Sequence, residues 1–522
     1  MMTVPSADPT MPTLRAADHE RFESALKEVR ARIGLTYGLM IGGEELEARR
    51  LRTQHSPTDR GLALGHFTAA TEIEVGLAFT AAQAAFPAWA ATSESDRRGV
   101  VRRALAQFEA RAFEFAAILS LEAGKTRQEA LREVWGTTEL ITAYCDEWAS
   151  HGFVPGVAGR AADGSRMVPH GVWTVFAPFH HPLALGAAPT AAALLAGNTV
   201  VLKSAEETSW SARLFAEMMR DAGIPAGVFT LISGAPKDMG DSMFHDVRVA
   251  GTTFTGARSA GRPLSQMMWT SHPPRPCVAE FTSKSARIVT STADIDTTAA
   301  SVVRDAFGLT GQRPGALSYL VVHHDVADAL ISRLAALTES LRIGDPALPG
   351  TDVGPLVSPD DHSHYRQVTH QLHEHGARVL FGGEVLSDHG RGAGHFVAPT
   401  LAEVPTDEHP CWGRELLLPL VMMRRFRAPD SAVLTIRDLK RTSAVRVYGD
   451  ADDRSWFTRA LANVADRPDA FAPEGSESAW TSLPASLRAE EEESAPDAGD
   501  AGNALHAYLA QYLRAESAPV RP

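Results

Sequence analysis

Cysteine, histidine and a few acidic residues are the side chains of this sequence with the potential for chemistry. The three cysteines, Cys145, Cys277 and Cys411, are far apart and form no CxxC pair, so their spacing predicts neither a disulfide framework nor a zinc site. His180 and His181 are adjacent, and imidazole is the side chain that exchanges protons near neutral pH. The doublet is a candidate for acid–base chemistry with a carboxylate such as Glu280. A metal site would need a further ligand, and we predict none.

A nucleophile is harder to find. Cys277 lies three residues before Glu280 in an apolar stretch that resembles a strand, so the two side chains are expected on opposite faces of a sheet. Cys145 falls in a predicted helix that precedes the sheet, and Cys411 falls in a loop, which makes Cys411 the leading thiol. Ser318 has no base at triad spacing and is a poor nucleophile without one.

Short apolar strands alternate with helical patterns in the middle of the chain. The predicted strands are residues 172–176, 199–202, 228–232 and 249–254. Such alternation predicts βαβ units and a parallel, doubly wound α/β sheet. A second alternating region over 286–464, with a strand at 317–322 and a helix at 326–341, predicts a second α/β domain.

Further helices are predicted on both sides of this region. Thr71 and Glu74 have capping-box spacing and open a helix to residue 86. Gly124 is the expected stop of a long helix over 94–121. The other predicted helices are residues 17–33, 127–148 and 503–516.

Composition limits the partners and the compartment. The formal net charge of −13 argues against nucleic acid or an anionic membrane as the main partner. The sequence has no apolar stretch long enough to span a bilayer and no N-terminal apolar segment typical of a secretory signal, so we expect a cytoplasmic protein. The acidic run at 490–493 is typical of a solvated linker.

Several short motifs occur in one order along the chain. They are Ile41-Gly42-Gly43-Glu44, Glu122-Ala123-Gly124-Lys125, Gly197-Asn198-Thr199, Gly223-Ile224-Pro225, Phe254-Thr255-Gly256, Gly344-Asp345-Pro346 and Gly354-Pro355-Leu356. In this order they resemble the aldehyde dehydrogenase superfamily over residues 41–464. The nearest branch is the Δ1-pyrroline-5-carboxylate (glutamate semialdehyde) dehydrogenases. The resemblance implies two doubly wound α/β domains with a small oligomerisation hairpin.

The family chemistry uses a cysteine thiolate, which attacks the aldehyde and is later released by water that a glutamate activates. An amide side chain and a backbone N–H stabilise the oxyanion, and NAD(P) accepts the hydride. The resemblance places Pro314 of Gly311-Gln312-Arg313-Pro314 at the position of the cysteine. Proline supplies neither a nucleophile nor an N–H.

Two other catalytic positions can be compared with the family. His180 stands where the family has its asparagine, in Pro178-Phe179-His180-His181-Pro182, and one interpretation is that it only fills the space of that amide. Glu280 aligns with the general-base glutamate, but Thr282 and Ser283 replace the two glycines that follow it.

The implied cofactor contacts are partly retained. Lys203 and Glu206 match the pair that holds the adenosine ribose, and Phe179 and Gly256 also fall at the cofactor. Glu415 matches the residue that reaches the nicotinamide ribose. Ala257 stands where the family has a serine. The resemblance therefore makes NAD a possible cofactor, alongside a small-molecule ligand.

The resemblance also suggests four parts of the chain. They are an N-terminal arm and helix (1–33), a dinucleotide-binding domain (34–272) with a hairpin excursion (151–167), a catalytic-type domain (273–465) and an acidic linker with a C-terminal segment (466–522). In the family the hairpin and the C-terminal strand build a dimer interface. We therefore expect a homodimer, or a hetero-oligomer with another enzyme.

Three functions remain open. The favoured one is a pseudoenzyme, a partner or small-molecule-binding protein that does not oxidise aldehydes in the conventional way. The first alternative is an enzyme of altered, non-thiol mechanism in specialised metabolism that uses His180 and Glu280 on an imine or another substrate. The second is an NAD-dependent aldehyde dehydrogenase with a substitute nucleophile such as Cys411.

Overall fold

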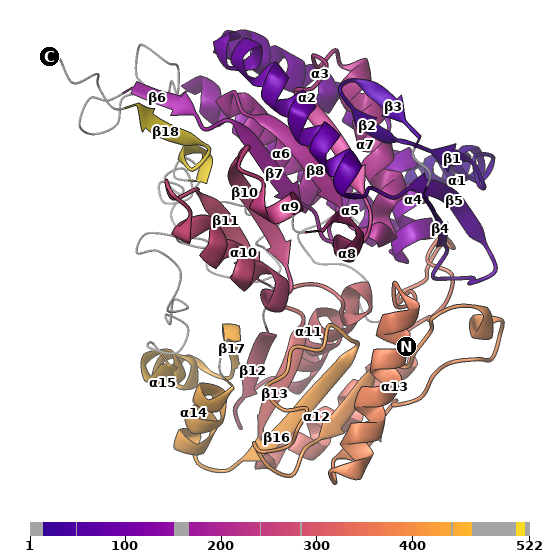
Figure 1. Cartoon of the computed structure of the whole chain (residues 1–522). Coiled ribbons are helices and arrows are strands. Elements are labelled where there is room, and N and C mark those ends of the chain that lie inside the picture. Colours follow the sequence, from indigo (N-terminus) through magenta and orange to yellow (C-terminus); the bar gives the residue numbers. More distant parts are fainter. Residues whose placement is uncertain are drawn as a thin grey trace, which may run out of the picture.

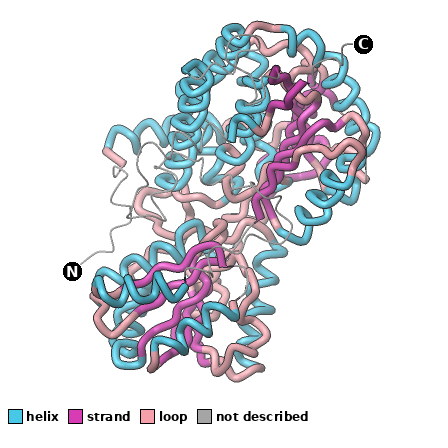
Figure 2. The backbone as a smooth tube through the Cα atoms, turned by 90° about the vertical axis from the view of Figure 1, so that its left-hand side faces the viewer, coloured by secondary structure: helices cyan, strands magenta, loops and turns pink. Residues whose placement is uncertain are grey.

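The chain forms two lobes, each built on one large β-sheet. The computed structural model describes residues 14–47, 50–150, 166–240, 242–281, 284–439, 442–461 and 508–516. Figure 1 shows the larger lobe, with the N-terminal helices, above the smaller one. Helices surround the sheet of each lobe (Figure 2). This is the predicted arrangement of two α/β units.

The sheet of the larger lobe has seven strands in the order β11-β10-β7-β8-β9-β2-β3. Five neighbouring strands run parallel, namely β11, β10, β7, β8 and β9. At the edge beside β9, β2 and β3 are added in antiparallel orientation. The strands are β2 Leu39–Ile41, β3 Glu44–Leu46, β7 Val172–Phe176, β8 Thr199–Ser204, β9 Phe229–Ser233, β10 Val249–Gly256 and β11 Cys277–Phe281. The four strands predicted from apolar runs are confirmed, with ends that move by one or two residues.

The sheet of the smaller lobe has six strands in the order β14-β15-β16-β13-β12-β17, parallel except for β14. They are β12 Lys284–Val289, β13 Leu317–His323, β14 Arg378–Phe381, β15 Thr400–Glu403, β16 Leu420–Phe426 and β17 Thr442–Tyr448. The remaining strands form two small sheets. One has the order β1 Thr36–Tyr37, β5 Ala63–Thr68 and β4 Leu51–His55, and the other pairs β6 Arg166–Pro169 with β18 Leu513–Glu516.

The helices of the larger lobe cover both faces of its sheet. They are α1 Ala16–Arg30, α2 Glu72–Ala91, α3 Glu94–Ala110, α4 Ala112–Ala123, α5 Arg127–Ser150, α6 Ala184–Ala196, η1 Glu206–Thr208, α7 Ser209–Asp221, α8 Pro236–Met239, α9 Ser242–His245 and α10 Arg258–Thr270. Those of the smaller lobe are α11 Ile295–Phe307, η2 Gly308–Gly311, α12 His324–Glu339, α13 Pro359–Glu374, η3 Arg391–Ala393, α14 Pro429–Asp438 and α15 Ala451–Leu461. Among the described residues, no helix is both long and apolar enough to cross a membrane.

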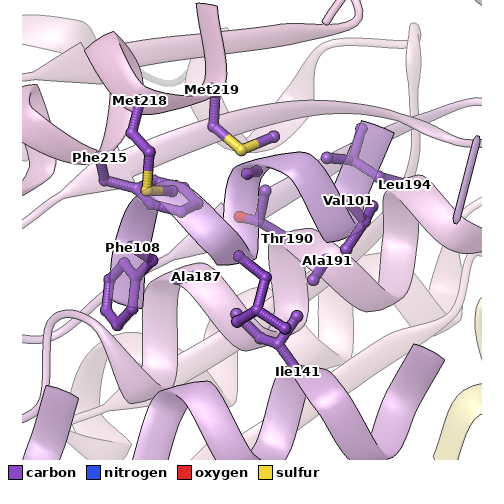
Figure 3. A pocket seen from close by; sticks show the side chains of 12 residues that line it. Val101, Phe108, Ile141, Ala187, Thr190, Ala191, Leu194, Phe215, Met218 and Met219 are labelled. Atoms are coloured by element: carbon purple, nitrogen blue, oxygen red, sulfur yellow. The ribbon is translucent and has the colours of Figure 1, made fainter. Parts of the chain in front are cut away.

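Helix α6 is buried on all sides and forms the centre of the larger lobe. A cavity of about 20 Å³ lies between α6 and its neighbours α3, α5 and α7. Figure 3 shows the Thr190 hydroxyl as the single polar atom drawn among side chains such as Phe108, Phe215 and Met219. A void of this size and apolar lining is a packing defect of the core, and we assign it no ligand.

Helix ends follow the predicted signals at two places and differ at a third. Thr71 and Glu74 form the predicted capping box of α2, and Gly124 ends α4 in a left-handed conformation (φ 72°). The helix predicted over 94–121 is two helices, because Arg111 leaves helical geometry (φ −101°, ψ 15°). The break lets the rings of Phe108 and Phe115 pack with their centroids 4.6 Å apart.

The C-terminal helix prediction is wrong for residues 513–516. The end of the segment predicted as a helix over 503–516 is strand β18, which pairs antiparallel with β6. Asn198 fixes it further, because its Nδ2 donates to the Tyr512 carbonyl at 2.9 Å. Long-range pairing with β6 therefore overrides the local helical pattern. Most of the predicted hairpin (151–167) and of the acidic linker lies outside the described residues.

Candidate active site

The carboxyl ends of the parallel strands bring most of the predicted site residues of the larger lobe to one edge. His180 and His181 follow β7, Lys203 is the last residue but one of β8, and Gly256 ends β10 beside β11. The register pairs Phe176 with Lys203 and with Phe254, and Thr255 with Glu280. Open parallel sheets bind their ligands at this edge. Helix α6 begins directly after the histidines and fixes the turn that carries them.

His180 is almost fully enclosed, with 2 % of its surface exposed. Its Nε2 has no hydrogen-bond partner among the residues that the structure describes. Burial lowers the pKa of His180 well below its ordinary value, and the neighbouring His181 and Lys125 act in the same direction. These surroundings keep the imidazole neutral and make it a weak base.

His181 lies beside a buried ion pair that the sequence did not reveal. Lys125 Nζ pairs with Glu133 Oε2, and both side chains are 1 % exposed. His181 Nδ1 is 3.4 Å from Lys125 Nζ and 3.7 Å from Glu133 Oε2, and its side chain is 31 % exposed. The second carboxylate oxygen of Glu133 accepts from the backbone N–H of Leu183 at 2.8 Å.

The pair is balanced in charge because its acid stays ionised. Burial by itself raises the pKa of Glu133, but the charge of Lys125 and the contact with His181 outweigh burial and lower that pKa to about 2. A buried carboxylate next to a buried ammonium therefore persists over the whole neutral range. Both residues stand in segments that resemble the family, but only tertiary structure joins them to His181.

Glu280 faces a small cavity on the inner side of the sheet edge. It is 8 % exposed, and the cavity, about 20 Å³, is also lined by Tyr144, Thr255 and Tyr508. Tyr508 comes from the C-terminal segment, and its hydroxyl lies 2.8 Å from that of Tyr512. No sequence signal placed Tyr508 here. His180 is not among the residues that line this cavity.

The loop with Pro314 is held firmly by both lobes. Leu309 and Thr310 have left-handed backbones (φ 50° and 54°), and a Cβ on Gly311 would collide with the Leu418 carbonyl. Glu129 Oε1 of α5 accepts from Leu309 N at 2.6 Å, and Gln312 Oε1 accepts from Val357 N at 2.9 Å. Pro314 itself is half-buried.

Residues 47–458 match the Aldehyde dehydrogenase family.

The chain belongs to the aldehyde dehydrogenase family.

Among its relatives, the chain is 31% identical over 425 residues to a 1-pyrroline-5-carboxylate dehydrogenase of Geobacillus sp. (strain WCH70), covering 80% of this chain and 81% of that protein. A second enzyme of that name, from Halalkalibacterium halodurans, is 31% identical over 418 residues, covering 79% and 80%.

Solved structures agree. A 1-pyrroline-5-carboxylate dehydrogenase from Thermus with bound NAD superposes with a TM-score of 0.79 at 25% identity, over 87% of this chain and 88% of that one. A putative aldehyde dehydrogenase from Burkholderia cenocepacia gives 0.74 at 28% identity, over 82% and 87%. The predicted family, branch and fold are confirmed.

None of the three thiols of this family member lies in an activating environment. Burial raises the pKa of Cys145 to about 11 and that of Cys277 to about 12. Cys411 is fully buried, its Sγ lies 3.7 Å from Gln371 Oε1, and burial raises its pKa as well. Along β11 the buried residues are Val278 and Glu280, so Cys277 faces the other way from Glu280, as predicted.

The residues expected to hold the adenosine ribose of NAD are suited to that task. Lys203 is half-buried at the end of β8, and burial lowers its pKa, while Glu207 and Glu206 favour the charged form. Arg52, which the sequence gave no reason to select, holds Glu206 with its Nε 3.6 Å from Oε1. A cation and a carboxylate at a strand end suit the hydroxyls of a ribose.

The remaining positions of the expected cofactor site differ more from the family. Gly256 has φ 157°, and Ala257 caps α10 without a side-chain hydrogen bond. Phe281 follows Glu280, and Arg258 stacks over its ring at 5.0 Å. Phe179 meets the His180 ring edge-on at 5.5 Å, and Glu415 lies half-buried in the loop before β16.

Proposed function

We propose that this member of the aldehyde dehydrogenase family binds a small molecule and does not oxidise aldehydes through a cysteine. The observation that carries the proposal is Pro314, in the segment that resembles the nucleophile loop of the family. A proline there provides no sulfur to attack an aldehyde. It also provides no backbone N–H to stabilise an oxyanion.

The environments of the three cysteines support this proposal. Thiolate is the reactive form of cysteine, and reactive cysteines are partly exposed with a lowered pKa. The pKa of each of Cys145, Cys277 and Cys411 is raised by burial, and Cys145 and Cys411 are also fully enclosed. Cys411, the leading substitute nucleophile from sequence, packs in the core of the smaller lobe between its sheet and α13.

Two features of the site support ligand binding, namely the fixed Pro314 loop and the charged pair expected at the ribose. The Pro314 loop is fixed to α5 and to the smaller lobe, Lys203 lies near the end of β8, and Glu206 begins η1 directly after that strand. Bound NAD would supply a hydride acceptor. We propose that Lys203 and Glu206 hold its adenosine ribose, and that the family's dimer or a hetero-oligomer is the working assembly.

A second candidate is an enzyme that needs no thiol. Glu280 lines a cavity that has room for about one water, and a charged cluster adjoins the histidine doublet. A substrate that requires no covalent intermediate, such as an imine, suits these residues.

Calorimetry with NAD, and an aldehyde panel followed by NADH absorbance, test the proposal on the purified full chain. The panel includes 1-pyrroline-5-carboxylate, after the names of the relatives. We expect NAD binding without NADH. Glu206→Ala removes a charged hydrogen bond to the ribose and should weaken NAD on the order of 10–100-fold. Glu339→Ala, which removes an exposed carboxylate of α12 in the smaller lobe, is the control.

NADH formation that iodoacetamide abolishes would contradict the proposal. NADH formation that resists iodoacetamide would favour the thiol-free enzyme. If NAD does not bind, the proposed role of Lys203 and Glu206 in holding its ribose is contradicted.

A further inference from the structure

A second pair of adjacent histidines lies in the smaller lobe, with an aspartate directly after it. His323 is the last residue of β13, His324 begins α12, and Asp325 follows. Strand β13 begins just after the Pro314 loop and is 7 residues long. Its far end therefore lies roughly 20 Å from its start, because a strand rises about 3.3 Å per residue. The cluster is separate from the candidate active site.

The three side chains of this cluster face one another. Asp325 places one carboxylate oxygen 2.9 Å from His324 Nε2 and the other 3.5 Å from His323 Nδ1. The centroids of the two imidazole rings are 4.7 Å apart. One ligand atom from each residue lies within 4.8 Å of the other two. A single ion can thus contact all three side chains.

These spacings are close to those of a zinc site. Zn²⁺ is bound at about 2.0–2.2 Å by imidazole nitrogen and by carboxylate oxygen, in tetrahedral geometry. Two ligand atoms of such a tetrahedron are about 3.4 Å apart. The distances of 2.9 and 3.5 Å from the Asp325 carboxylate to the two imidazoles lie on either side of that value. Binding therefore needs only small movements of the side chains.

The surroundings fix the two rings and leave the carboxylate open to solvent. His323 packs edge-on against Phe426, with the ring centroids 5.2 Å apart, and its side chain is 14 % exposed. His324 Nδ1 is covered by protein, so Nε2 is the nitrogen that faces Asp325. The Asp325 N–H donates to His323 Nδ1 at 3.4 Å, a weak contact that an ion at Nδ1 would replace. The Asp325 side chain is 62 % exposed, so an ion reaches the cluster from solvent.

We propose that His323, His324 and Asp325 form a site for a divalent transition-metal ion, and that Zn²⁺ is the ion this ligand set suits. Two imidazoles with one carboxylate favour Zn²⁺ over Ca²⁺ and Mg²⁺, which prefer sites built from oxygen ligands. Three protein ligands leave the fourth position of the tetrahedron to water. The bound ion joins the end of β13 to the start of α12. The site is independent of the proposed function, because neither NAD nor an aldehyde takes part in it.

Calorimetric titration of the chelator-treated full chain with Zn²⁺ tests the site. Other histidines of the chain can also take up Zn²⁺, so the wild type is compared with His324→Gln and with Asp325→Asn. We expect each substitution to weaken the tightest zinc equivalent by at least about tenfold, since even changes around the ligands weaken metal binding by about 10–100-fold. His370→Gln is the matched control, because His370 and Glu374 form an exposed histidine–carboxylate pair on α13, with Nε2 and Oε1 3.2 Å apart.

Co²⁺ is a second probe, which reports on the geometry of the site. Tetrahedral Co²⁺ absorbs visible light far more strongly than the hydrated ion, so absorbance measures its binding at a site of zinc geometry. We expect this absorption in the wild type and in His370→Gln, and its loss in His324→Gln and in Asp325→Asn. A wild type that binds no Zn²⁺, or zinc binding that is equal in the wild type and in either of the last two variants, would overturn the inference.

Discussion

Lys125→Met is expected to lower the free energy of unfolding by about 4 kcal/mol at pH 8. Removing one partner of a buried ion pair leaves the other charge without compensation, which costs about 3–5 kcal/mol. Here the charge left behind is Glu133, 1 % exposed. The measurement is urea unfolding followed by tryptophan fluorescence.

The double variant Lys125→Met, Glu133→Gln separates charge from packing. It removes both charges and should recover most of the loss, because the glutamine side chain still accepts from Leu183 N. The single variant should also be less destabilised at pH 5 than at pH 8. Without Lys125 the pKa of Glu133 rises, and the carboxyl then takes up a proton instead of remaining a buried anion. A loss below about 1 kcal/mol, equal at both pH values, would contradict the assigned ion pair.

The second large effect is a loss of stability on mild acidification, to which His395 contributes. Burial lowers the pKa of His395 to about 4, and the charges of His362 and Arg60 add to this. In the unfolded chain a histidine has a pKa of about 6.5. Between these values the unfolded state binds a proton that the folded state does not, so stability falls as pH decreases from 6.5 to 4. At pH 5 the contribution lost is about 2 kcal/mol.

Urea unfolding of the wild type and of His395→Asn at a series of pH values measures the contribution of His395 to the free energy of unfolding. The variant should show a shallower dependence between pH 7 and 5 than the wild type. Glu122, whose pKa burial raises to about 7, acts in the opposite sense and is present in both proteins, so the difference between the two curves isolates His395. His389→Asn, on an exposed loop, is the control. Parallel curves for the wild type and His395→Asn would contradict the assignment.

Sequence patterns predicted those parts of the fold that depend on local periodicity. The strands around Trp173 and Val201 are apolar runs with β-branched residues, and such runs are typical of buried parallel strands. The opposite orientation of Cys277 and Glu280 follows from the two-residue repeat of a strand. The stop at Gly124 follows from the left-handed conformation that glycine adopts most easily.

The parts that were missed depend on tertiary contacts. Leu513–Glu516 becomes a strand because β6 supplies a partner, which no local pattern encodes. The joining of Lys125, Glu133 and His181 requires α5 and the turn after β7 to meet. Which member of the histidine doublet is buried is decided in an irregular turn, where no periodicity applies. The sequence therefore singled out the histidine doublet but not which of its two members is buried.

In the proposed function no thiol of this chain is available for catalysis, and native alkylation tests this property most directly. The folded protein is treated with iodoacetamide at pH 7.5, with and without NAD, and its mass and peptides are analysed. We predict no rapid modification of Cys145, Cys277 or Cys411 in the folded protein, and modification of all three in urea. Rapid labelling of one cysteine in the folded protein, slowed by NAD or by an aldehyde, would reveal a substitute nucleophile and contradict the account.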